Sequence, residues 1–388
     1  MKILYLHSEY RTAVPSGEND VVQRDVNSLL NLGFNLKYVR LRSDDFLSQH
    51  KFSQYVQLLY FLLNKNPQKS VRDEIIDMNP EIVHIHNTFP LVGHQIFRFL
   101  KKRRIQIVLT IHNTRLTCLN SSHFRSDSSC FRCSDEKGYL WGVFFGCFQN
   151  SKLNSLYLSI YNRKFLRTLK LVDHFIVLNE YSRKLLLRNG IANSAISIRV
   201  PTPKSFGYQN PLKAKKIVFA GRLSREKGVD LLLHSWKISR ISQQGWTLLI
   251  AGSGELQPSV LEAAESDPSI KFLGFLPHDL LTRELMDCSI LCLPSRGFEG
   301  FPTIIVEAAQ FGISVITSDV GPLAELTQSW VVATAADAQA LSKELMRQSN
   351  LDLSSQFSDS REWYEKRKLE SESNGDLLGI YRRLLRSA

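Results

Sequence analysis

The chain has 388 residues, which is too long for one ordinary hydrophobic core and suits two domains. Hydrophobic residues make up 43% and charged residues 22%, a composition that excludes an intrinsically disordered or collagen-like chain. No apolar stretch reaches the roughly 18 residues of a spanning helix, and the first strand runs straight into polar sequence. We therefore expect no transmembrane helix, no signal peptide and a cytoplasmic location.

The net charge of +12 is concentrated in the first half. Residues 1–210 hold 29 Lys and Arg against 15 Asp and Glu, whereas residues 211–388 hold 20 against 22. This asymmetry favours an anionic partner for the first half, either a phosphorylated substrate or an acidic membrane surface. Solvated basic faces without a partner would give the same counts. No nucleic-acid recognition module accompanies the charge, so nucleic-acid binding is not expected.

Short apolar strands alternate with helical patterns through the first 200 residues. Helices are expected at 20–32 and 181–188, and the expected strands are Lys2–Leu6, Leu36–Arg40, Ile82–Ile85, Ile105–Ile111 and Phe175–Leu178. Strands separated by helices of this length pair in parallel, so the pattern predicts a doubly wound α/β sheet.

A segment rich in Pro, Gly and polar residues, 201–211, is typical of a linker. The alternation then restarts, with expected strands at Lys216–Ala220, Thr247–Ala251, Ile270–Phe272, Ser289–Leu293 and Ser314–Thr317. We place an N-terminal acceptor-side domain at 1–203 and a C-terminal domain at 211–370. Residues 371–388 form a C-terminal helix that can cross back to the first domain. Two such domains facing across a cleft would bind ligands at the carboxyl ends of their strands.

Two cations, Arg222 and Lys227, follow the first strand of the second half after Gly221. Cations beside a helix N-terminus suit a diphosphate, although basic loops usually face solvent. The later turn at Gly252-Ser-Gly254 lacks the third glycine of a dinucleotide fingerprint, because position 257 is Gln. A tight strand-to-helix turn explains these two glycines, and we reject NAD binding there.

Glu299 and Glu307 lie eight positions apart around the start of a helix. One carboxylate can meet the hydroxyls of a sugar while the other meets a ribose. The N–H groups of the helix start can hydrogen-bond the sugar and the phosphates. The alternative is an ordinary N-terminal acid followed by an exposed helix acid.

This pair, with Gly300-Phe301 between its members, resembles the E-x7-E motif of retaining glycosyltransferases with the GT-B fold, in family 4, the glycosyl transferases group 1. The family's other motifs stand in the same order at Gly221-Arg222-Leu223, Lys227-Gly228, Gly252-Ser-Gly254, Phe272-Leu-Gly274-Phe275, Pro294-Ser295, Gly312 and Gly321. The resemblance spans essentially the whole chain. It implies two Rossmann-like domains and a retaining transfer from a UDP- or GDP-sugar to a glycan, lipid-linked or other acceptor, in cell-surface polysaccharide biosynthesis.

The same resemblance implies a role for each motif of the second half. Arg222 and Lys227 would neutralise the donor diphosphate without a metal, and Glu307 would hold the ribose. Glu299 would hold the donor sugar, together with the backbone of Gly300, Phe301, Pro302 and Thr303. The base would meet the backbone of Gly274, Phe275 and Leu276. Pro302 stands where the family commonly has Gly, which removes one backbone donor.

In the first half, Ser16-Gly17-Glu18 resembles the family's Gly-rich loop under the donor phosphates, where Gly17 lets the backbone approach. His112 ends a strand and resembles a family His that hydrogen-bonds the donor sugar without acting as an acid. A purely structural hydrogen bond is the alternative. His84 and His86 alternate along a strand and should face the same side, in a structural or acceptor-lining role.

Four of the six cysteines, Cys118, Cys130, Cys133 and Cys147, lie in an insert at 115–150. The C-x2-C step with one cysteine on each side suits a structural zinc ion. Two disulfides, which the cytoplasm disfavours, and four free thiols remain open. Cys288 and Cys292 are expected in the core.

Two segments, Lys101–Arg104 and Tyr157–Lys170, could bring the protein to an anionic bilayer, because they combine basic with apolar residues. A surface helix packed on its own core would show the same pattern.

Two other functions fit the same residues. A nucleotide-sugar epimerase would turn over its donor without an acceptor. A non-catalytic nucleotide-sugar-binding scaffold would not need the complete set of Arg222, Lys227, Glu299 and Glu307, which argues against it.

Overall fold

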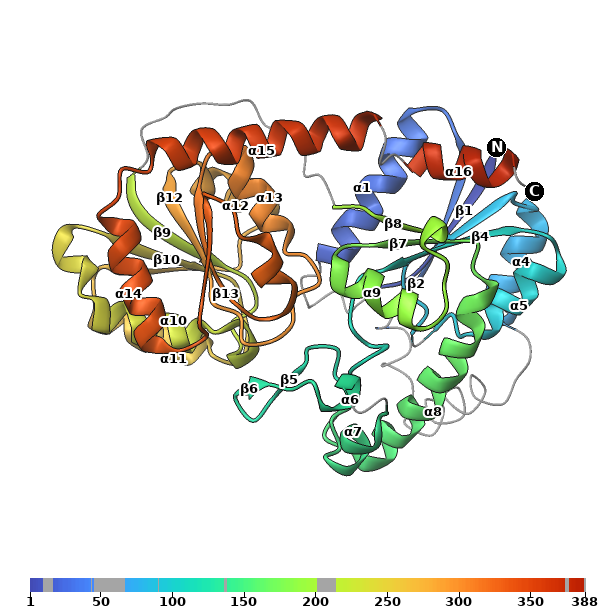
Figure 1. Cartoon of the computed structure of the whole chain (residues 1–388), viewed down its shortest axis with the longest axis horizontal. Coiled ribbons are helices and arrows are strands. Elements are labelled where there is room, and N and C mark those ends of the chain that lie inside the picture. Colours follow the sequence, from blue (N-terminus) through green and yellow to red (C-terminus); the bar gives the residue numbers. More distant parts are fainter. Residues whose placement is uncertain are drawn as a thin grey trace. The chain divides into compact units, whose positions relative to one another are not determined.

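The structure is a computed structural model, and it describes residues 1–9, 17–42, 44, 67–89, 91–135, 138–200, 214–373 and 377–386 (Figure 1). Ser16 and the predicted linker lie outside these residues. The chain divides into two compact units. The first is drawn from Met1–Ser121, Arg132–Val200 and Glu372–Ala388, and the second from Ser122–Phe131 and Pro201–Ser371. None of the described helices has the length and apolar character needed to cross a bilayer.

The first unit contains a six-stranded, wholly parallel sheet in the order β2-β1-β3-β4-β7-β8. Its strands are β1 (Lys2–Glu9), β2 (Asn35–Arg42), β3 (Ile82–Ile85), β4 (Gln106–Ile111), β7 (His174–Val177) and β8 (Ile196–Ile198). The chain passes from β1 to β2 on one side and returns to β3 on the other. The direction of winding therefore reverses between β1 and β3, which is where open α/β sheets bind ligands.

Helices cover both faces of this sheet because successive strand residues point to opposite sides. Ile3 and Tyr5 share a core with α1 (Gly17–Asn31) and the C-terminal helix α16 (Leu377–Arg386). Leu4 and Leu6 pack on the opposite face, which is covered by α4 (Lys69–Met78), α5 (Gln95–Lys102), α8 (Lys152–Thr168) and α9 (Glu180–Arg188). The two ends of the chain thus meet in one core.

The second unit has the same plan, with a parallel sheet in the order β11-β10-β9-β12-β13-β14. Its strands are β9 (Ala214–Ala220), β10 (Thr247–Ala251), β11 (Ile270–Gly274), β12 (Cys288–Leu293), β13 (Ser314–Ser318) and β14 (Val331–Thr334). Here the winding reverses between β9 and β12. The predicted fold class, with two doubly wound parallel sheets, is confirmed. The short strands β8 and β14 were not predicted.

The helices of the second unit again form two layers (Figure 1). One layer consists of α10 (Val229–Ser239), α11 (Gln257–Ser266) and α14 (Ala338–Ser349), and its core includes Trp236. The other consists of α12 (His278–Met286) and α13 (Thr303–Gln310), and α15 (Ser354–Ser373) follows α14. Cys288 and Cys292 are fully buried in β12, as the sequence predicts.

The cysteine insert is divided between the units. Its hairpin, β5 (Phe124–Arg125) and β6 (Ser128–Ser129), belongs to the second unit, whereas α6 (Arg132–Asp135) and α7 (Leu140–Phe144) belong to the first. All six cysteines lie in the described residues and are thiols without disulfides. Within the described chain no three His, Cys, Asp or Glu side chains are placed to hold a metal ion.

The predicted four-cysteine zinc site is therefore not formed. Cys118 donates a hydrogen bond to Asn120 Oδ1 at 2.8 Å. Cys133 and Cys147 pack against the apolar core of the first unit. Cys130 belongs to the hairpin of the second unit.

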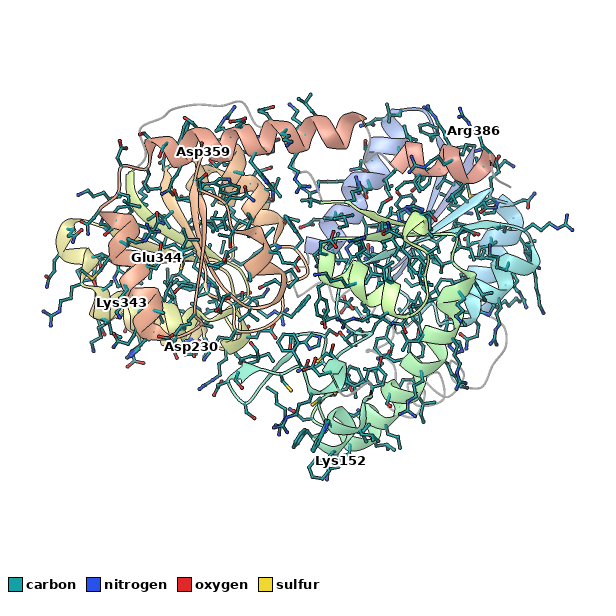
Figure 2. All side chains as sticks on the ribbon, in the orientation of Figure 1. Lys152, Asp230, Lys343, Glu344, Asp359 and Arg386 are labelled. Atoms are coloured by element: carbon teal, nitrogen blue, oxygen red, sulfur yellow. The ribbon has the colours of Figure 1, made fainter. Side chains whose placement is uncertain are left out.

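A patch of large apolar side chains is exposed on α7 and the first half of α8. It comprises Leu140, Trp141, Phe144, Leu153, Leu156 and Ile160, and we call it the α7–α8 patch. Exposed Arg163 and Arg167 continue the same face of α8, and Lys152 projects from the start of that helix (Figure 2). In contrast, Leu158 and Phe165 of the segment predicted to touch a bilayer are buried in the core.

Candidate active site

The second unit brings its polar loops together where the winding of the sheet reverses. Strand β9 leads into Gly221 and Arg222, and β12 leads into Pro294 and Ser295. These loops approach so closely that a Cβ on Gly228 would lie 2.0 Å from the Pro294 carbonyl oxygen. Gly228 also has a φ of 73°, so only glycine fits this position without strain.

The neighbouring turn after β10 shows the same close approach. Gly252 has a φ of 144°, and a Cβ there would lie 1.9 Å from the Gly221 carbonyl oxygen. The backbone N–H of Gly221 donates to Ala251 at 3.1 Å. This turn therefore serves backbone packing, which accounts for the glycine without a dinucleotide.

A partly buried ion pair joins the two loops. Lys227 Nζ lies 2.5 Å from Glu299 Oε1, and the Ser295 hydroxyl donates to the same oxygen at 2.6 Å. Burial by itself would raise the pKa of Glu299, but the charge and hydrogen bond of Lys227 outweigh it and lower that pKa. Glu299 is therefore ionised at neutral pH. Sequence reasoning placed Ser295 in a motif but did not identify this contact.

Arg222 stands at the edge of the same group. Its guanidinium lies 3.3 Å from Glu226, remains more than half exposed, and helps to lower the pKa of Glu299. Arg222, Lys227, Glu299 and Ser295 thus gather at one end of the sheet.

Arg296 fixes the loop that carries Glu299. One of its terminal nitrogens donates to both carboxylate oxygens of Asp230, at 2.6 and 2.7 Å, and its Nε donates to the Arg225 carbonyl at 2.9 Å. Ser318, at the end of β13, donates to the Ser295 carbonyl. Sequence reasoning missed these supports, because Arg296 and Asp230 are 66 residues apart.

The hairpin of the insert packs on the same loops. The Phe298 N–H donates to the Ser122 carbonyl at 2.6 Å, and the Ser129 hydroxyl donates to the Arg296 carbonyl at 2.8 Å. Asp127 pairs with Arg225 at 3.2 Å. The insert thus buttresses the loop before Glu299, a role that its cysteines did not suggest.

Glu307 forms a second group. The turn from Gly300 to Pro302 leads into α13, whose N-terminus receives no side-chain cap from Pro302. Glu307 is buried in this helix, and its Oε1 lies 3.1 Å from His278 Nε2. His278 follows Gly274, Phe275 and Leu276 closely in the chain, so the helix acid lies near the segment predicted to meet the base. No sequence signal singled out His278.

The first unit also gathers polar groups where its sheet reverses. His84 Nδ1 lies 2.7 Å from the Tyr381 hydroxyl, and its Nε2 lies 2.7 Å from Thr110 Oγ1. Both ring nitrogens are satisfied, so His84 is structural. Its ring centroid is 4.2 Å from that of His86, which confirms that the two face the same side. Tyr381 reaches them from the C-terminal helix.

His112 is hydrogen-bonded inside this cluster, with its Nε2 2.9 Å from His86 Nδ1. Burial lowers the pKa of His112 to about 3, helped by nearby His7 and Arg199. Burial likewise lowers the pKa values of His7, His84 and His86. At neutral pH His112 is therefore an uncharged hydrogen-bonding group.

Gly17, the described part of the predicted glycine loop, is the first residue of α1. Two residues on, Asn19 Oδ1 lies 2.9 Å from His7 Nε2. The start of α1 therefore lies beside the end of β1, at the ligand-binding edge of the sheet.

Two family models match the chain, "Glycosyltransferase Family 4" over residues 26–200 and "Glycosyl transferases group 1" over residues 214–349. Together they span most of the sequence. The chain belongs to this glycosyltransferase family. The first of these matches lies in the N-terminal half of the chain and the second in the C-terminal half.

Relatives of this chain include an uncharacterized glycosyltransferase of Haemophilus influenzae, 30% identical over 154 residues, and the amylovoran biosynthesis glycosyltransferase AmsK of Erwinia amylovora, 30% identical over 145 residues. These alignments cover 39% and 34% of the chain and 43% and 35% of the relatives. The chain thus matches less than half the length of either.

Solved structures resemble the whole chain. Sucrose-phosphate synthase from Thermosynechococcus elongatus aligns with a TM-score of 0.70 at 16% identity and covers 100% of both chains. Anabaena HepE in complex with UDP aligns with a TM-score of 0.63 at 14% identity and covers 100% of this chain and 99% of HepE. At such identities the likeness shows the GT-B fold alone.

The buried histidines make stability depend on pH. Their folded pKa values lie below the unfolded value near 6.5, so the unfolded chain takes up protons that the folded chain excludes. We expect the free energy of unfolding to fall as pH drops below about 6.5, by roughly 1.4 kcal/mol per pH unit for each such histidine. Urea unfolding between pH 7 and pH 5 measures this slope.

His112→Gln should reduce the pH dependence of the free energy of unfolding by the equivalent of about one proton, because it removes one group that takes up a proton only on unfolding. His234→Gln, at an exposed position, serves as the matched control and should leave the slope unchanged. An identical slope in His112→Gln and the unsubstituted protein would contradict the assignment of His112 as a buried neutral group.

Proposed function

We propose that the protein is a retaining glycosyltransferase that takes a sugar from a nucleotide-diphosphate donor bound by its second unit. The observation that carries this proposal is the grouping of Arg222, Lys227 and Glu299 at the reversal point of the second sheet. Two cations and one partly buried carboxylate suit a diphosphate joined to a hydroxyl-rich sugar.

Each group has a distinct role in this proposal. Arg222 and Lys227 neutralise the diphosphate, a task that metal ions perform in other phosphate sites. When the donor enters, Lys227 exchanges part of its contact with Glu299 for the phosphates, which leaves the carboxylate to accept from sugar hydroxyls. The start of α13 receives no side-chain cap from Pro302, and its first N–H groups strengthen the site for negative charge.

Glu307 holds the ribose, and the segment Gly274 to Leu276 meets the base. The 3.1 Å contact between Glu307 and His278 supports this role, because it ties the helix acid to the loop that follows that segment. The HepE structures in complex with UDP, and with UDP and glucose, make UDP a reasonable first nucleotide to test.

The first unit receives the acceptor. Its excess of basic residues suits an acceptor with negative charge, such as a lipid-linked glycan. His112, neutral and ordered by His86, donates or accepts a hydrogen bond at the donor sugar. The relative AmsK acts in amylovoran biosynthesis, which supports a place in polysaccharide biosynthesis.

Donor binding should depend strongly on Glu307. A nucleotide sugar held only by the folded state raises the melting temperature, with about 2.7 kcal/mol of stabilisation at a hundredfold excess over the dissociation constant. Thermal shift against UDP-, GDP- and ADP-sugars should therefore select one nucleotide. Glu307→Ala should weaken binding of the selected nucleotide sugar about 10-fold or more, because a hydrogen bond to a charged group is lost.

Glu307 is a cleaner probe than Lys227 or Glu299, since those two side chains pair with each other and removing either leaves the other without its counter-charge. Glu265→Ala, an exposed glutamate of α11, is the matched control and should keep full donor affinity. Equal donor affinity in Glu307→Ala and the unsubstituted protein would remove Glu307 from the site.

Transfer should proceed with retention of configuration. We propose attack on the face from which the phosphate leaves, with that phosphate helping to take the acceptor's proton. In this scheme no carboxylate acts as a nucleophile, unlike the paired acids of a retaining hydrolase.

Slow hydrolysis of the donor tests the stereochemistry even before the acceptor is known. Proton NMR of the first sugar released, before mutarotation, should show the anomer of the donor. Release of the opposite anomer would rule out retention. An epimerised donor would support the epimerase alternative, and a bound but unreacted donor the scaffold alternative.

We also propose that the α7–α8 patch rests on an anionic membrane surface. Six large apolar side chains are exposed together, two of them aromatic, and Lys152, Arg163 and Arg167 border them. Apolar side chains with basic neighbours are the composition of an interfacial helix. Membrane contact at this place would bring the first unit to a lipid-linked acceptor.

Flotation with vesicles of phosphatidylglycerol and phosphatidylcholine tests the patch. The double substitution Leu140→Ser and Phe144→Ser should lower the bound fraction several-fold, because both side chains are more than half exposed. Leu261→Ser, at an exposed leucine of α11, is the control and should bind like the unsubstituted protein. Binding should fall as salt rises. Full binding by the double variant would exclude this patch as the contact.

A further inference from the structure

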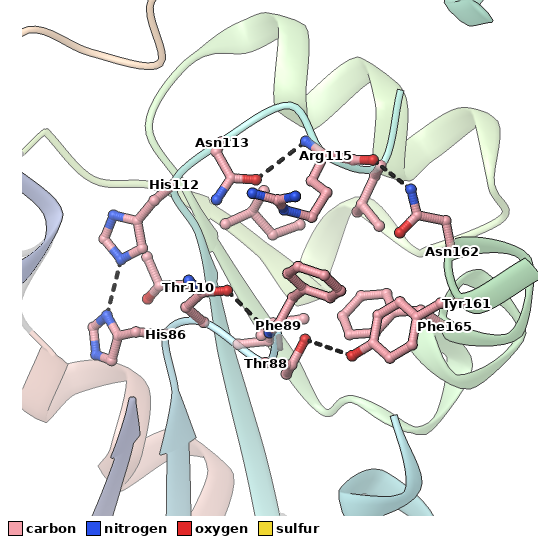
Figure 3. A pocket seen from close by; sticks show the side chains of 14 residues that line it. His86, Thr88, Phe89, Thr110, His112, Asn113, Arg115, Tyr161, Asn162 and Phe165 are labelled. Carbon is pink, nitrogen blue, oxygen red and sulfur yellow. Dashed lines mark hydrogen bonds between the residues drawn. The ribbon is translucent and has the colours of Figure 1, made fainter. Parts of the chain in front are cut away.

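A pocket of about 50 Å³ lies in the first unit, between the ends of β3 and β4 and the helix α8 (Figure 3). Its lining includes Thr88, Phe89, Asn113, Arg115, Tyr161 and Asn162, and His86 and His112 lie at one side of it (Figure 3). Since a water molecule occupies roughly 30 Å³ of liquid, the pocket has room for one small polyatomic group. None of its fourteen lining residues is acidic.

Arg115 is the only permanent charge in this lining. Its Nε and Nη1 atoms are buried and make no hydrogen bond within the described part of the chain. No ion pair of the described residues involves Arg115. The Arg115 side chain is partly buried. Two buried N–H donors without an acceptor are costly, because they have lost water and gained no hydrogen bond.

The surrounding contacts hold Arg115 in place rather than satisfy its charge. Its backbone N–H donates to Asn113 Oδ1 at 3.1 Å, and its carbonyl accepts from Asn162 Nδ2 at 2.7 Å (Figure 3). The guanidinium carbon lies 4.7 Å from the centre of the Phe89 ring and 5.9 Å from that of Phe148. These contacts fix a cation over aromatic faces and leave its N–H groups unused.

We propose that this pocket binds a phosphate group of the acceptor, with Arg115 as its principal ligand. A phosphate offers three strong acceptor oxygens and up to two negative charges, which suits a rigid guanidinium better than a neutral hydroxyl does. The hydroxyl of Thr88 and the side-chain amide of Asn113 stand in the same lining as further hydrogen-bonding groups. The inference rests on the proposed function, because it names the class of acceptor that the transferase uses.

A phosphate on a soluble sugar and a phosphate on a lipid present the same chemistry. Glucose 1-phosphate in solution and vesicles that contain phosphatidic acid separate these two sources. Either probe supports the pocket if its binding depends on Arg115, and the tighter of the two identifies the source.

Isothermal titration with inorganic phosphate tests the site directly. The protein is first saturated with UDP, so that phosphate cannot bind beside Arg222 and Lys227. We expect millimolar binding in the unsubstituted protein and a loss of about 10-fold or more in Arg115→Met. Arg115→Lys keeps the charge and should lose less. Arg188→Met removes an exposed arginine of the same unit and should bind phosphate normally.

The same titrations distinguish a failure of the phosphate pocket from a failure of the proposed donor function. UDP affinity should be unchanged in Arg115→Met, because the donor is bound by the second unit. If none of UDP, GDP and ADP binds even the unsubstituted protein, the proposed function fails, and phosphate titration without a nucleotide still tests the pocket. Equal phosphate binding in Arg115→Met and the unsubstituted protein, no phosphate binding in either, or a preference for glucuronate over phosphate would each overturn the inference.

Discussion

The constraint on which the structure depends is that both sheets are wholly parallel and covered by helices on both faces. Strands such as β3 and β12 are buried along their whole length and can carry few groups that need water. Polar chemistry is therefore confined to the loops at the carboxyl ends, where the winding reverses. In the second unit these loops approach so closely that Gly228 and Gly252 are obligatory. The close packing of these backbone segments therefore also fixes the geometry of the site.

The two units treat charge at these edges in opposite ways. The second unit keeps a partly buried ion pair, in which Lys227 holds Glu299 ionised. The first unit keeps its histidines neutral by burial, so that His84 and His112 act through hydrogen bonds alone. An ionised edge suits a charged diphosphate, whereas a neutral edge suits hydroxyl groups. Arg115 of the first unit has two buried N–H groups without an acceptor among the described residues, and these are the reason to assign it a ligand.

Several supports of the site come from distant parts of the chain. Tyr381 of the last helix satisfies His84, and the same helix shares its core with the first strand. The hairpin of the cysteine insert supports the loop of Arg296. The insert therefore contributes packing, and its thiols take part in hydrogen bonds and apolar contacts. A cysteine spacing that suits zinc carries no information about where the chain directs those side chains.

The sequence by itself determined the two parallel sheets, because alternating apolar runs and helical patterns leave little other choice. It also marked Arg222, Lys227, Glu299 and Glu307, because they follow two of the expected strands as short motifs in a recognisable order. Only the tertiary structure decided which of them meet, which thiols stay apart, and that two buried nitrogens of Arg115 find no acceptor among the described residues. These facts depend on contacts across 70 residues or more, such as Lys227 with Glu299 or His84 with Tyr381. Local patterns cannot encode such contacts, because they arise when the strands pair and the helices pack.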